Sequence, residues 1–324
     1  MMKKVKLSII ILSWNTKELL RDCLKSVEAE TKALKKQKIE AIVVDNNSSD
    51  DSTEMVKKDF PKTQLIKNNK NLGFSRGNNI GIKEAQGEFI MLLNSDTVLE
   101  KGSLKTLLDF AVLKENSAFS SLLFLQDKKP QIDYYMKFPN LWQVFLYHNP
   151  VIRPIALKIP FLRNLICFLP KKEIFEVDQL PGAALLASRK VWNRVGLLDE
   201  DYSFLYEDVD WCYRAKKKKV DLFVVPDSKV LHIGGASWKK KLKEETFGFY
   251  KQYFSSMLLF VRKNYSKISL VEFRICLFFN FLILGVFYFL FSFLSFKFFK
   301  KAKEKARLAF YCLIYKTTSS RVFL

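Results

Sequence analysis

The first 125 residues alternate between short apolar runs and longer segments with apolar residues at helical spacing. Val5–Ser13 is a continuous apolar run of strand length, and the stretch from Lys17 to about Ala33 places its leucines on one helical face. Strands separated by helices predict an α/β fold with a mostly parallel central sheet flanked by helices. The predicted strands are Val5–Ser13, Ile39–Asp45, Gln64–Lys67 and Glu88–Leu93, and the predicted helices are Lys17–Ala33, a short one from Ser52, Ser75–Ala85 and Lys101–Leu113.

Polar clusters follow the predicted strands at the points where the strands end. They are Ser13–Asn15, Asp45–Asp50, Asn68–Gly73 and Asn94–Asp96. In sheets of this kind, ligands bind beyond the carboxyl ends of the strands. Loops are polar in general, but this explains poorly why acids directly follow two separate strands. We therefore expect a binding site at this edge of the sheet.

The chain changes character at about residues 127–180, where aromatic residues, cations and prolines are interspersed. Such a mixture suits a membrane interface or an ordinary hydrophobic subdomain. Strand and helix patterns resume at Ala183–Ser188, Glu207–Lys219 and Leu222–Val225, and His232–Lys241 reads as a loop. We expect residues 1–240 to form one domain with an insertion at about 127–180.

An uncharged apolar segment occupies Ile275–Phe296, and its 22 residues are long enough to cross a bilayer. Basic residues lie on both sides, in an expected helical segment at 241–274 and in a tail at 297–324. The distribution of positive charge therefore does not decide how this segment would be oriented in a membrane. We expect a transmembrane or membrane-embedded helix, with a re-entrant or in-plane arrangement still open, that anchors the protein at the cytoplasmic face of the cell membrane.

The composition narrows the possible partners and excludes several kinds of site. The chain has 54 Lys and Arg against 33 Asp and Glu, a net charge of +21. This excess indicates a polyanionic partner, such as nucleic acid, an anionic membrane or phosphorylated substrates. The alternative is a general compositional bias toward lysine. The five dispersed cysteines argue against a zinc ribbon or disulfide framework, and two histidines are too few for a three-histidine metal site. Walker-type, GxGxxG and GxSxG motifs are absent from the sequence.

Three motifs could carry chemistry. Asp96 follows a central strand, where a carboxylate can hold a Mg²⁺ or Mn²⁺ ion that bridges a diphosphate. The acids of Tyr206–Trp211 begin a predicted helix, where they can favour the helix dipole or supply a general base for an acceptor hydroxyl. His232–Trp238 combines a possible metal ligand with glycines and a following lysine run; it suits either a loop over a diphosphate or an ordinary surface loop.

Taken in order, these pieces resemble the family 2 glycosyltransferases, which have the nucleotide-binding GT-A fold. The ordered set is specific, although no single stretch is. One departure is Asn94, which stands in place of the first acid of the family's DxD motif and is similar to the rhamnosyltransferase-like branch. The matching stretches are Ser8–Asn15, Val43–Asp50, Asn71–Gly81, Leu92–Thr97, Pro181–Arg189, Gly196–Asp210 and His232–Ser237.

The resemblance implies a role for each matched position. The nucleotide would be bound by Asn15, by Asp45 at its base, and by Asn71 and Gly73 in the adjoining pocket. The diphosphate and its metal would be held by Asp96, with His232 and Ser237 on a loop that approaches them. Asp208 would be the catalytic base, with Glu207 orienting the acceptor.

The expected activity is therefore an inverting, metal-dependent glycosyl transfer that uses Mg²⁺ or Mn²⁺. The first expected donor is dTDP-rhamnose, and the expected acceptor is a glycan or a polyprenyl-diphosphate-linked glycan of surface-polysaccharide synthesis. We expect a membrane as a partner and no nucleic acid. The alternatives are a metal-dependent nucleotidyltransferase, or a non-catalytic basic protein that binds membranes or nucleic acid; the second leaves the ordered acids unexplained.

Overall fold

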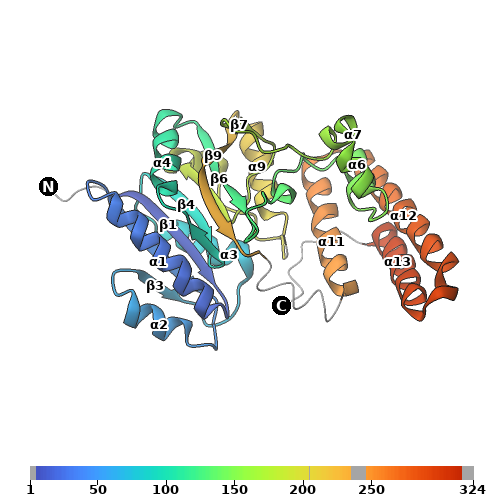
Figure 1. Ribbon diagram of the computed structural model, residues 1–324, viewed down its shortest axis with the longest axis horizontal. Coiled ribbons are helices and arrows are strands. Elements are labelled where there is room, and N and C mark those ends of the chain that lie inside the picture. The colour runs from blue at the N-terminus through green and yellow to red at the C-terminus, as the bar shows by residue number, and fades with distance from the viewer. Residues whose placement is uncertain (1–4, 204, 235–245, 316–324) are drawn as a thin grey trace. The chain divides into compact units, whose positions relative to one another are not determined.

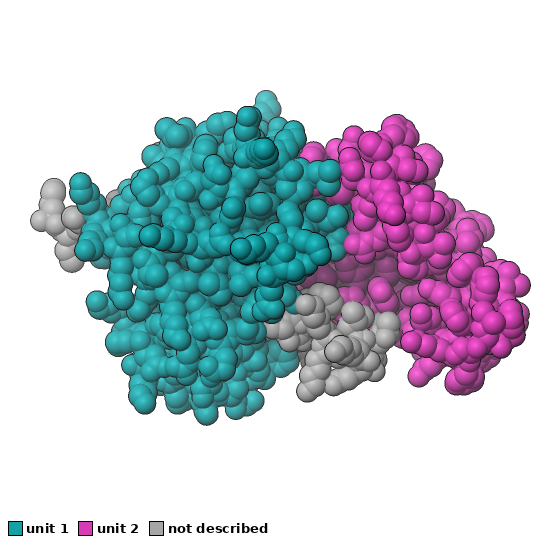
Figure 2. Space-filling model, in the orientation of Figure 1, with its two compact units in different colours: residues 1–136, 169–200, 207–239 teal, residues 137–168, 201–206, 240–324 magenta. Residues whose placement is uncertain are grey.

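The computed structural model describes residues 5–203, 205–234 and 246–315 of the 324-residue chain. These residues fall into two compact units (Figure 2). Unit 1 comprises residues 1–136, 169–200 and 207–239, and unit 2 comprises residues 137–168, 201–206 and 240–324. Of the segment expected as an insertion at about 127–180, residues 137–168 therefore belong to the same unit as the C-terminal helices.

Unit 1 is built on one mixed sheet in the strand order β3-β2-β1-β4-β8-β6-β9-β5, with β7 paired to β9 (Figure 1). The β3-β2-β1-β4 half is parallel throughout, which confirms the expected parallel core. Antiparallel pairing enters with β8, β5 and β7. The strands are β1 Val5–Ser13, β2 Lys38–Asp45, β3 Gln64–Lys67, β4 Phe89–Asn94, β5 Thr97–Leu99, β6 Ser117–Phe124, β7 Phe175–Glu176, β8 Ala184–Ser188 and β9 Asp221–His232.

Strand β1 is apolar at nearly every position because helices cover both of its faces. Its odd-numbered residues, such as Ile9 and Ile11, are fully buried in the main core with the apolar faces of α1 and α4. Its even-numbered residues face α3, where a Cβ added at Gly81 would lie 2.4 Å from Cγ2 of Ile10. A strand buried on both faces needs the unbroken apolar run seen in the sequence.

The helices of unit 1 close the two faces of the sheet. On the face opposite α1, the indole rings of Trp192 and Trp211 pack 4.6 Å apart, and Trp192 donates to the carbonyl of Ile90 in β4. This contact joins α8 and α9 to the sheet. The helices are α1 Lys17–Ala33, α2 Ser52–Asp59, α3 Gly73–Glu84, α4 Ser103–Leu113, the 3₁₀ helix η1 Ile132–Tyr134, α8 Arg189–Val195 and α9 Glu207–Lys217.

Unit 2 is helical in its described residues, and it differs from the sequence expectation at its C-terminal end. The apolar segment predicted at 275–296 is not one helix: α12 ends at Leu290 and α13 begins at Phe296. Ser295 stops the run because its side chain caps α13 by accepting from the N–H of Lys297. Much of the predicted basic tail is therefore helix. The helices are α5 Leu141–Tyr147, α6 Arg153–Lys158, α7 Pro160–Asn164, α11 Thr246–Asn264, α12 Lys267–Leu290, η2 Ser292–Leu294 and α13 Phe296–Ile314.

Candidate active site

Strand register aligns two of the predicted acids at one rim of the sheet. Asp45, the last residue of β2, pairs with Ser13 at the end of β1. Asn94, at the end of β4, pairs with Leu12 of β1, and Asp96 follows two residues later. Because these strands run parallel, Asp45 and Asp96 emerge at the same carboxyl edge.

The antiparallel strand β8 brings the third acid to that edge. Its first residue, Ala184, pairs with Leu93, so Gly182 lies just beyond the end of β4. The N–H of Gly182 donates to Oδ2 of Asp208 at 3.0 Å. A Cβ added at Gly182 would lie 3.2 Å from the ring of Phe74 and 3.6 Å from Cβ of Asp208, so a side chain here would require the Phe74 ring to shift slightly. The structure thus places Asp45, Asp96 and Asp208 at one rim.

Asp45 has one carboxylate oxygen without a hydrogen-bond partner. Oδ2 accepts from the N–H of Ser48 at 3.0 Å, which fixes the orientation of the carboxylate. Oδ1 is buried and has no partner among the described residues. A buried polar atom left in this state needs a donor from elsewhere, because an unmet acceptor in the interior is costly.

Asn46 organises the loop next to Asp45. Its Nδ2 donates to Oδ1 of Asn71 at 3.2 Å and to the carbonyl of Gly73 at 3.1 Å, while its Oδ1 accepts from Asn68 at 2.8 Å. Gly73 has φ of +79°, a conformation that glycine adopts without strain. Asn71 and Gly73 therefore adjoin Asp45 as expected. Asn46 was not singled out from the sequence, although its position directly after Asp45 is a signal.

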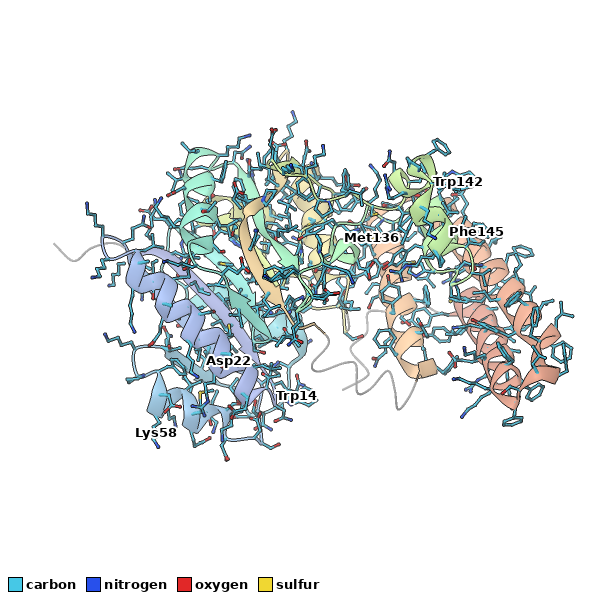
Figure 3. The ribbon with its side chains drawn as sticks, viewed as in Figure 1. Trp14, Asp22, Lys58, Met136, Trp142 and Phe145 are labelled. Atoms are coloured by element: carbon cyan, nitrogen blue, oxygen red, sulfur yellow. The ribbon has the colours of Figure 1, made fainter. Side chains whose placement is uncertain are left out.

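Asn15 connects the first two loops of the rim. Its side-chain oxygen accepts from the N–H of Ser49 at 2.8 Å, and its own N–H donates to Oγ of Ser48 at 2.9 Å. The carboxamide oxygen is therefore engaged in holding the Asp45 loop. The neighbouring Trp14 is 42% exposed, and its ring lies at the end of β1 (Figure 3).

A short strand ladder brings Asp96 and His232 together. Thr97 of β5 pairs with His232, the last residue of β9, and the N–H of Ile233 donates to the carbonyl of Asp96 at 3.0 Å. Nε2 of His232 lies 3.4 Å from Oδ1 of Asp96, and both side chains are almost completely buried. His232 was expected in a loop; it ends a strand instead, which fixes it more firmly. Ser237, the other residue predicted here, lies outside the described residues.

Gln131 fixes which nitrogen of His232 carries the proton. Its Nε2 donates to the carbonyl of His232 at 2.7 Å, which sets the orientation of the amide. Its Oε1 must then face Nδ1 of the same ring, at 2.9 Å, and accept a hydrogen bond from the Nδ1–H group. Nε2 of His232 is left to present its lone pair toward Asp96. No sequence pattern pointed to Gln131, which lies 101 residues from its partner.

These donors fit a hard divalent cation that completes its coordination with a substrate. Among the described residues, no three His, Cys, Asp or Glu side chains are grouped as metal ligands. Asp96 and His232 supply two, and Mg²⁺-type ions are commonly bound by one or two carboxylates with phosphate oxygens and water in the other positions. A separation of 3.4 Å suits neighbouring positions around one ion. Asp96 and the neutral imidazole of His232 would therefore hold the ion against a diphosphate.

Replacement of Gln131 tests this arrangement. Gln131→Leu is expected to lower Mn²⁺ affinity about 10–100-fold, because loss of an outer hydrogen bond lets the imidazole rotate and change tautomer. Gln131→Glu keeps the acceptor for Nδ1 and should lose less. Isothermal titration of Mn²⁺ in the presence of a nucleoside diphosphate measures both. Equal affinities for the parent and Gln131→Leu would contradict the assignment.

The carboxyls of Glu207 and Asp208 titrate as a pair with divided roles. Burial, and then the charge of Asp208, raises the pKa of Glu207 to about 8. Burial also raises the pKa of Asp208, but the N–H groups of Gly182 and Val209 donate to this carboxylate at 3.0 and 2.8 Å and favour its charged form. Glu207 therefore holds its proton more strongly, and the two N–H groups favour the carboxylate form of Asp208.

This pair predicts a pH-dependent stability. The pKa of Glu207 rises from 4.5 to about 8 on folding, so the folded protein holds a proton that the unfolded chain releases. Stability should then be highest below pH 4.5 with respect to this group and fall as the pH rises toward 8. Glu207→Gln removes the titration and should flatten the curve. Unfolding temperatures from pH 5 to 9 measure the difference; parallel curves for the two proteins would contradict it.

Tyr134 packs beside His232 and is influenced by two of the predicted acids. Its ring packs against that of His232 with centroids 5.2 Å apart. Burial raises the pKa of Tyr134, and the next contributions come from the charges of Asp96 and Asp208. The charges of both carboxylates therefore act on one partly buried phenol, as expected if the two acids face one site. Tyr134 was counted in the sequence only as part of the aromatic insertion.

A separate surface hollow of about 400 Å³ lies away from these residues. It is lined by Phe89 at the start of β4 and Ser188 at the end of β8, which places it at the opposite rim. Its cations are engaged: Arg189 donates to the carbonyls of Ala85 and Gly87. We assign the chemistry to the carboxyl rim, where the acids and the unpartnered acceptor converge.

Comparison with known proteins shows a family match and related enzymes. Residues 8–159 match the family described as Glycosyl transferase family 2. The hexosyltransferase Agl10 of low-salt glycan biosynthesis in Haloferax volcanii is 24% identical over 67% of this chain and 63% of its own length. The dTDP-rhamnosyl transferase RfbF of Shigella flexneri is 26% identical over 67% of each chain.

A solved structure agrees with the fold. GalNAc-T7, crystallised with UDP, GalNAc and Mn²⁺, superposes with a TM-score of 0.56 at 15% identity, over 81% of this chain and 48% of that one. The chain therefore spans less than two thirds of the Haloferax protein and about half of the solved chain. The likeness confirms the expected GT-A fold. The family match assigns residues 8–159 of this chain to glycosyltransferase family 2.

Proposed function

We propose that this glycosyltransferase moves a sugar from a nucleoside diphosphate to an acceptor hydroxyl with inversion at the anomeric carbon. One observation carries the proposal: the partly buried Asp208 and the Asp96–His232 pair lie at the same rim of the sheet, and the charges of both carboxylates act on Tyr134. A base and a diphosphate site on one rim suit a single displacement, in which acceptor and leaving group stand on opposite sides of the sugar carbon.

The residues divide the reaction between them. Asp208 takes the proton of the acceptor hydroxyl while that oxygen forms a bond to the anomeric carbon. The bond from this carbon to the diphosphate breaks, and the nucleoside diphosphate departs with the electron pair. A divalent cation, when bound, offsets the charge on the departing diphosphate. Asp96 and His232 would hold it, and protonated Glu207 can donate a hydrogen bond to the acceptor.

Asp45 supports a choice among nucleotide bases. Its buried, unpartnered Oδ1 is an acceptor and calls for a donor. The ring N–H of thymine, uracil or guanine supplies one, whereas cytosine and adenine can supply a donor only from their amino groups. A thymine nucleotide agrees with the name of the Shigella relative. We therefore keep dTDP-rhamnose as the first donor, and a glycan or polyprenyl-diphosphate-linked glycan as the acceptor.

A thermal-shift screen followed by product analysis tests this function. With Mn²⁺ present, dTDP and UDP should raise the unfolding temperature more than CDP or ADP, because binding to the folded state alone stabilises it. The matching nucleotide sugar and a hydroxyl acceptor should then yield a nucleoside diphosphate and an inverted anomeric centre by NMR. Release of pyrophosphate would instead identify a nucleotidyltransferase, and retention of configuration would exclude single displacement.

A further inference from the structure

Helix α12 carries an exposed apolar face along its whole length. Among the helices that the structure describes, it is the one long and apolar enough to cross a bilayer. Its outward residues recur every three or four positions and are each 44–63% exposed. That spacing places them on a single face of the helix. This face, the α12 stripe, consists of Val271, Ile275, Phe279, Ile283, Val286 and Leu290.

The opposite face of α12 is committed to protein contacts. Phe273, Leu277 and Leu284 are buried there. Within the same face, Asn280 is fully buried and its Oδ1 accepts from Nδ2 of Asn149 at 3.0 Å. One face of α12 therefore packs against the rest of unit 2 and satisfies a buried amide there. Protein, and not lipid, covers this face of the helix.

Helix α13 packs along α12 and brings cations beside it. Its exposed charged residues are all basic, since Glu304 is partly buried beside Lys305. Lys300, Lys303 and Arg307 follow one another at helical spacing on its exposed side. If α12 crossed a bilayer, this adjoining row would be carried into the hydrocarbon, where lysine and arginine are costly.

The apolar residues at the ends of α13 extend the exposed surface. Phe296 and Ile314 are 78% and 72% exposed, and Phe293 in the turn between the helices is 79% exposed. Aromatic and aliphatic side chains interleaved with cations are typical of helices that lie in the lipid headgroup region. The same cations would repel a second copy of the chain, whereas anionic lipid headgroups complement them.

We propose that the α12–α13 hairpin docks in the plane of an anionic membrane surface, with the α12 stripe buried among the lipids and the α13 cations at the headgroups. The hairpin binds one leaflet and does not cross the bilayer. This docking does not depend on the proposed glycosyl transfer. Vesicle binding is measured without a sugar donor, so either inference can fail while the other stands.

Vesicle sedimentation with the full-length chain tests the docking surface. The protein is expected to bind vesicles of phosphatidylcholine that contain about 30% phosphatidylglycerol. Its binding to vesicles of phosphatidylcholine alone should be weak. Ile275→Ser combined with Ile283→Ser should lower the partition coefficient at least about 10-fold. Replacing Lys300, Lys303 and Arg307 with glutamine should lower it about 100-fold on anionic vesicles only.

A matched control and a depth measurement complete the experiment. Val112→Ser with Leu113→Ser removes an apolar pair, 42% and 79% exposed, from α4 in unit 1, and it should leave binding unchanged. Tryptophan introduced singly at Val271, Phe279 and Leu290 should be quenched by brominated lipids at one shallow depth, measured against the parent chain. A deepest position at Phe279 would show a spanning helix and overturn the proposal.

Light scattering without lipid tests whether a second copy of the chain covers the α12 stripe instead. The parent chain and the Ile275→Ser, Ile283→Ser variant are expected to have the same mass in solution. If the parent is an oligomer that this variant converts to a monomer, while vesicle binding is unaffected, the stripe is an interface between copies and the membrane proposal is wrong.

Discussion

Asp208→Asn is expected to lower kcat by about 10²–10⁴-fold, the range that general acid–base catalysis contributes. The asparagine keeps the shape of the side chain, and its oxygen can still accept from the N–H of Gly182. It cannot take the proton of the acceptor hydroxyl. Donor affinity should therefore remain close to that of the parent. Steady-state kinetics together with calorimetry of the nucleoside diphosphate measure both quantities.

Asp210→Asn provides the matched control on the same helix. Asp210 is buried, and its Oδ2 accepts from Nε of Arg214 at 2.7 Å. Removing the charge of one partner in a buried pair is destabilising, so the unfolding temperature should fall. The turnover of the molecules that remain folded should not change. Undiminished turnover in Asp208→Asn, or an equal loss in Asp210→Asn, would remove Asp208 from the role of base.

Asp96→Ala is expected to weaken Mn²⁺-dependent donor binding by more than about 100-fold, because even outer-shell changes at metal sites cost 10–100-fold. The variant keeps His232 but loses the carboxylate that faces it at 3.4 Å. Its donor affinity should equal that of the parent chain measured in EDTA, since only the metal-dependent part of binding is removed. Calorimetry with and without EDTA compares the two proteins.

Asp109→Ala is the control for this second experiment. Asp109 lies on α4 and pairs with Lys105 at 2.6 Å on an exposed surface. Its replacement removes a carboxylate of the same kind without touching the rim, and donor affinity should not change. If Asp96→Ala still responds to Mn²⁺ as the parent does, the metal ligands lie elsewhere and the assignment of Asp96 is wrong.

The parallel half of the sheet could be predicted because its strands have a clear sequence pattern. β1 and β4 are continuous apolar runs that end in polar clusters, and helices separate them. β6 escaped prediction because Ser120 and Ser121 interrupt its apolar pattern, although both are fully buried. Oγ of Ser121 meets Oγ of Ser228 at 2.7 Å, a partner 107 residues away that no local pattern reveals.

The candidate site was predictable where it follows strand ends and unpredictable where it depends on distant pairing. Asp45 and Asp96 are marked by position, since the parallel strands before them end at one edge. Gln131 and Tyr134 are not marked by position. Gln131 precedes the 3₁₀ helix η1 and Tyr134 ends it, and their roles arise from contacts with the distant His232. The extent of α12 was misjudged because hydrophobicity continues past Leu290 while the helix does not.

The pairing of β5 with β9 has a consequence for folding. Asp96 and His232 stand 136 positions apart in the chain, and the contact between them exists only once the last strand of unit 1 has joined the sheet. A fragment that stops at residue 159, where the family match ends, would contain the carboxylate without its imidazole partner. If Asp96 and His232 hold Mn²⁺ together as proposed, tight binding of the ion would require a completely folded unit 1, and nascent or truncated chains would not bind it tightly.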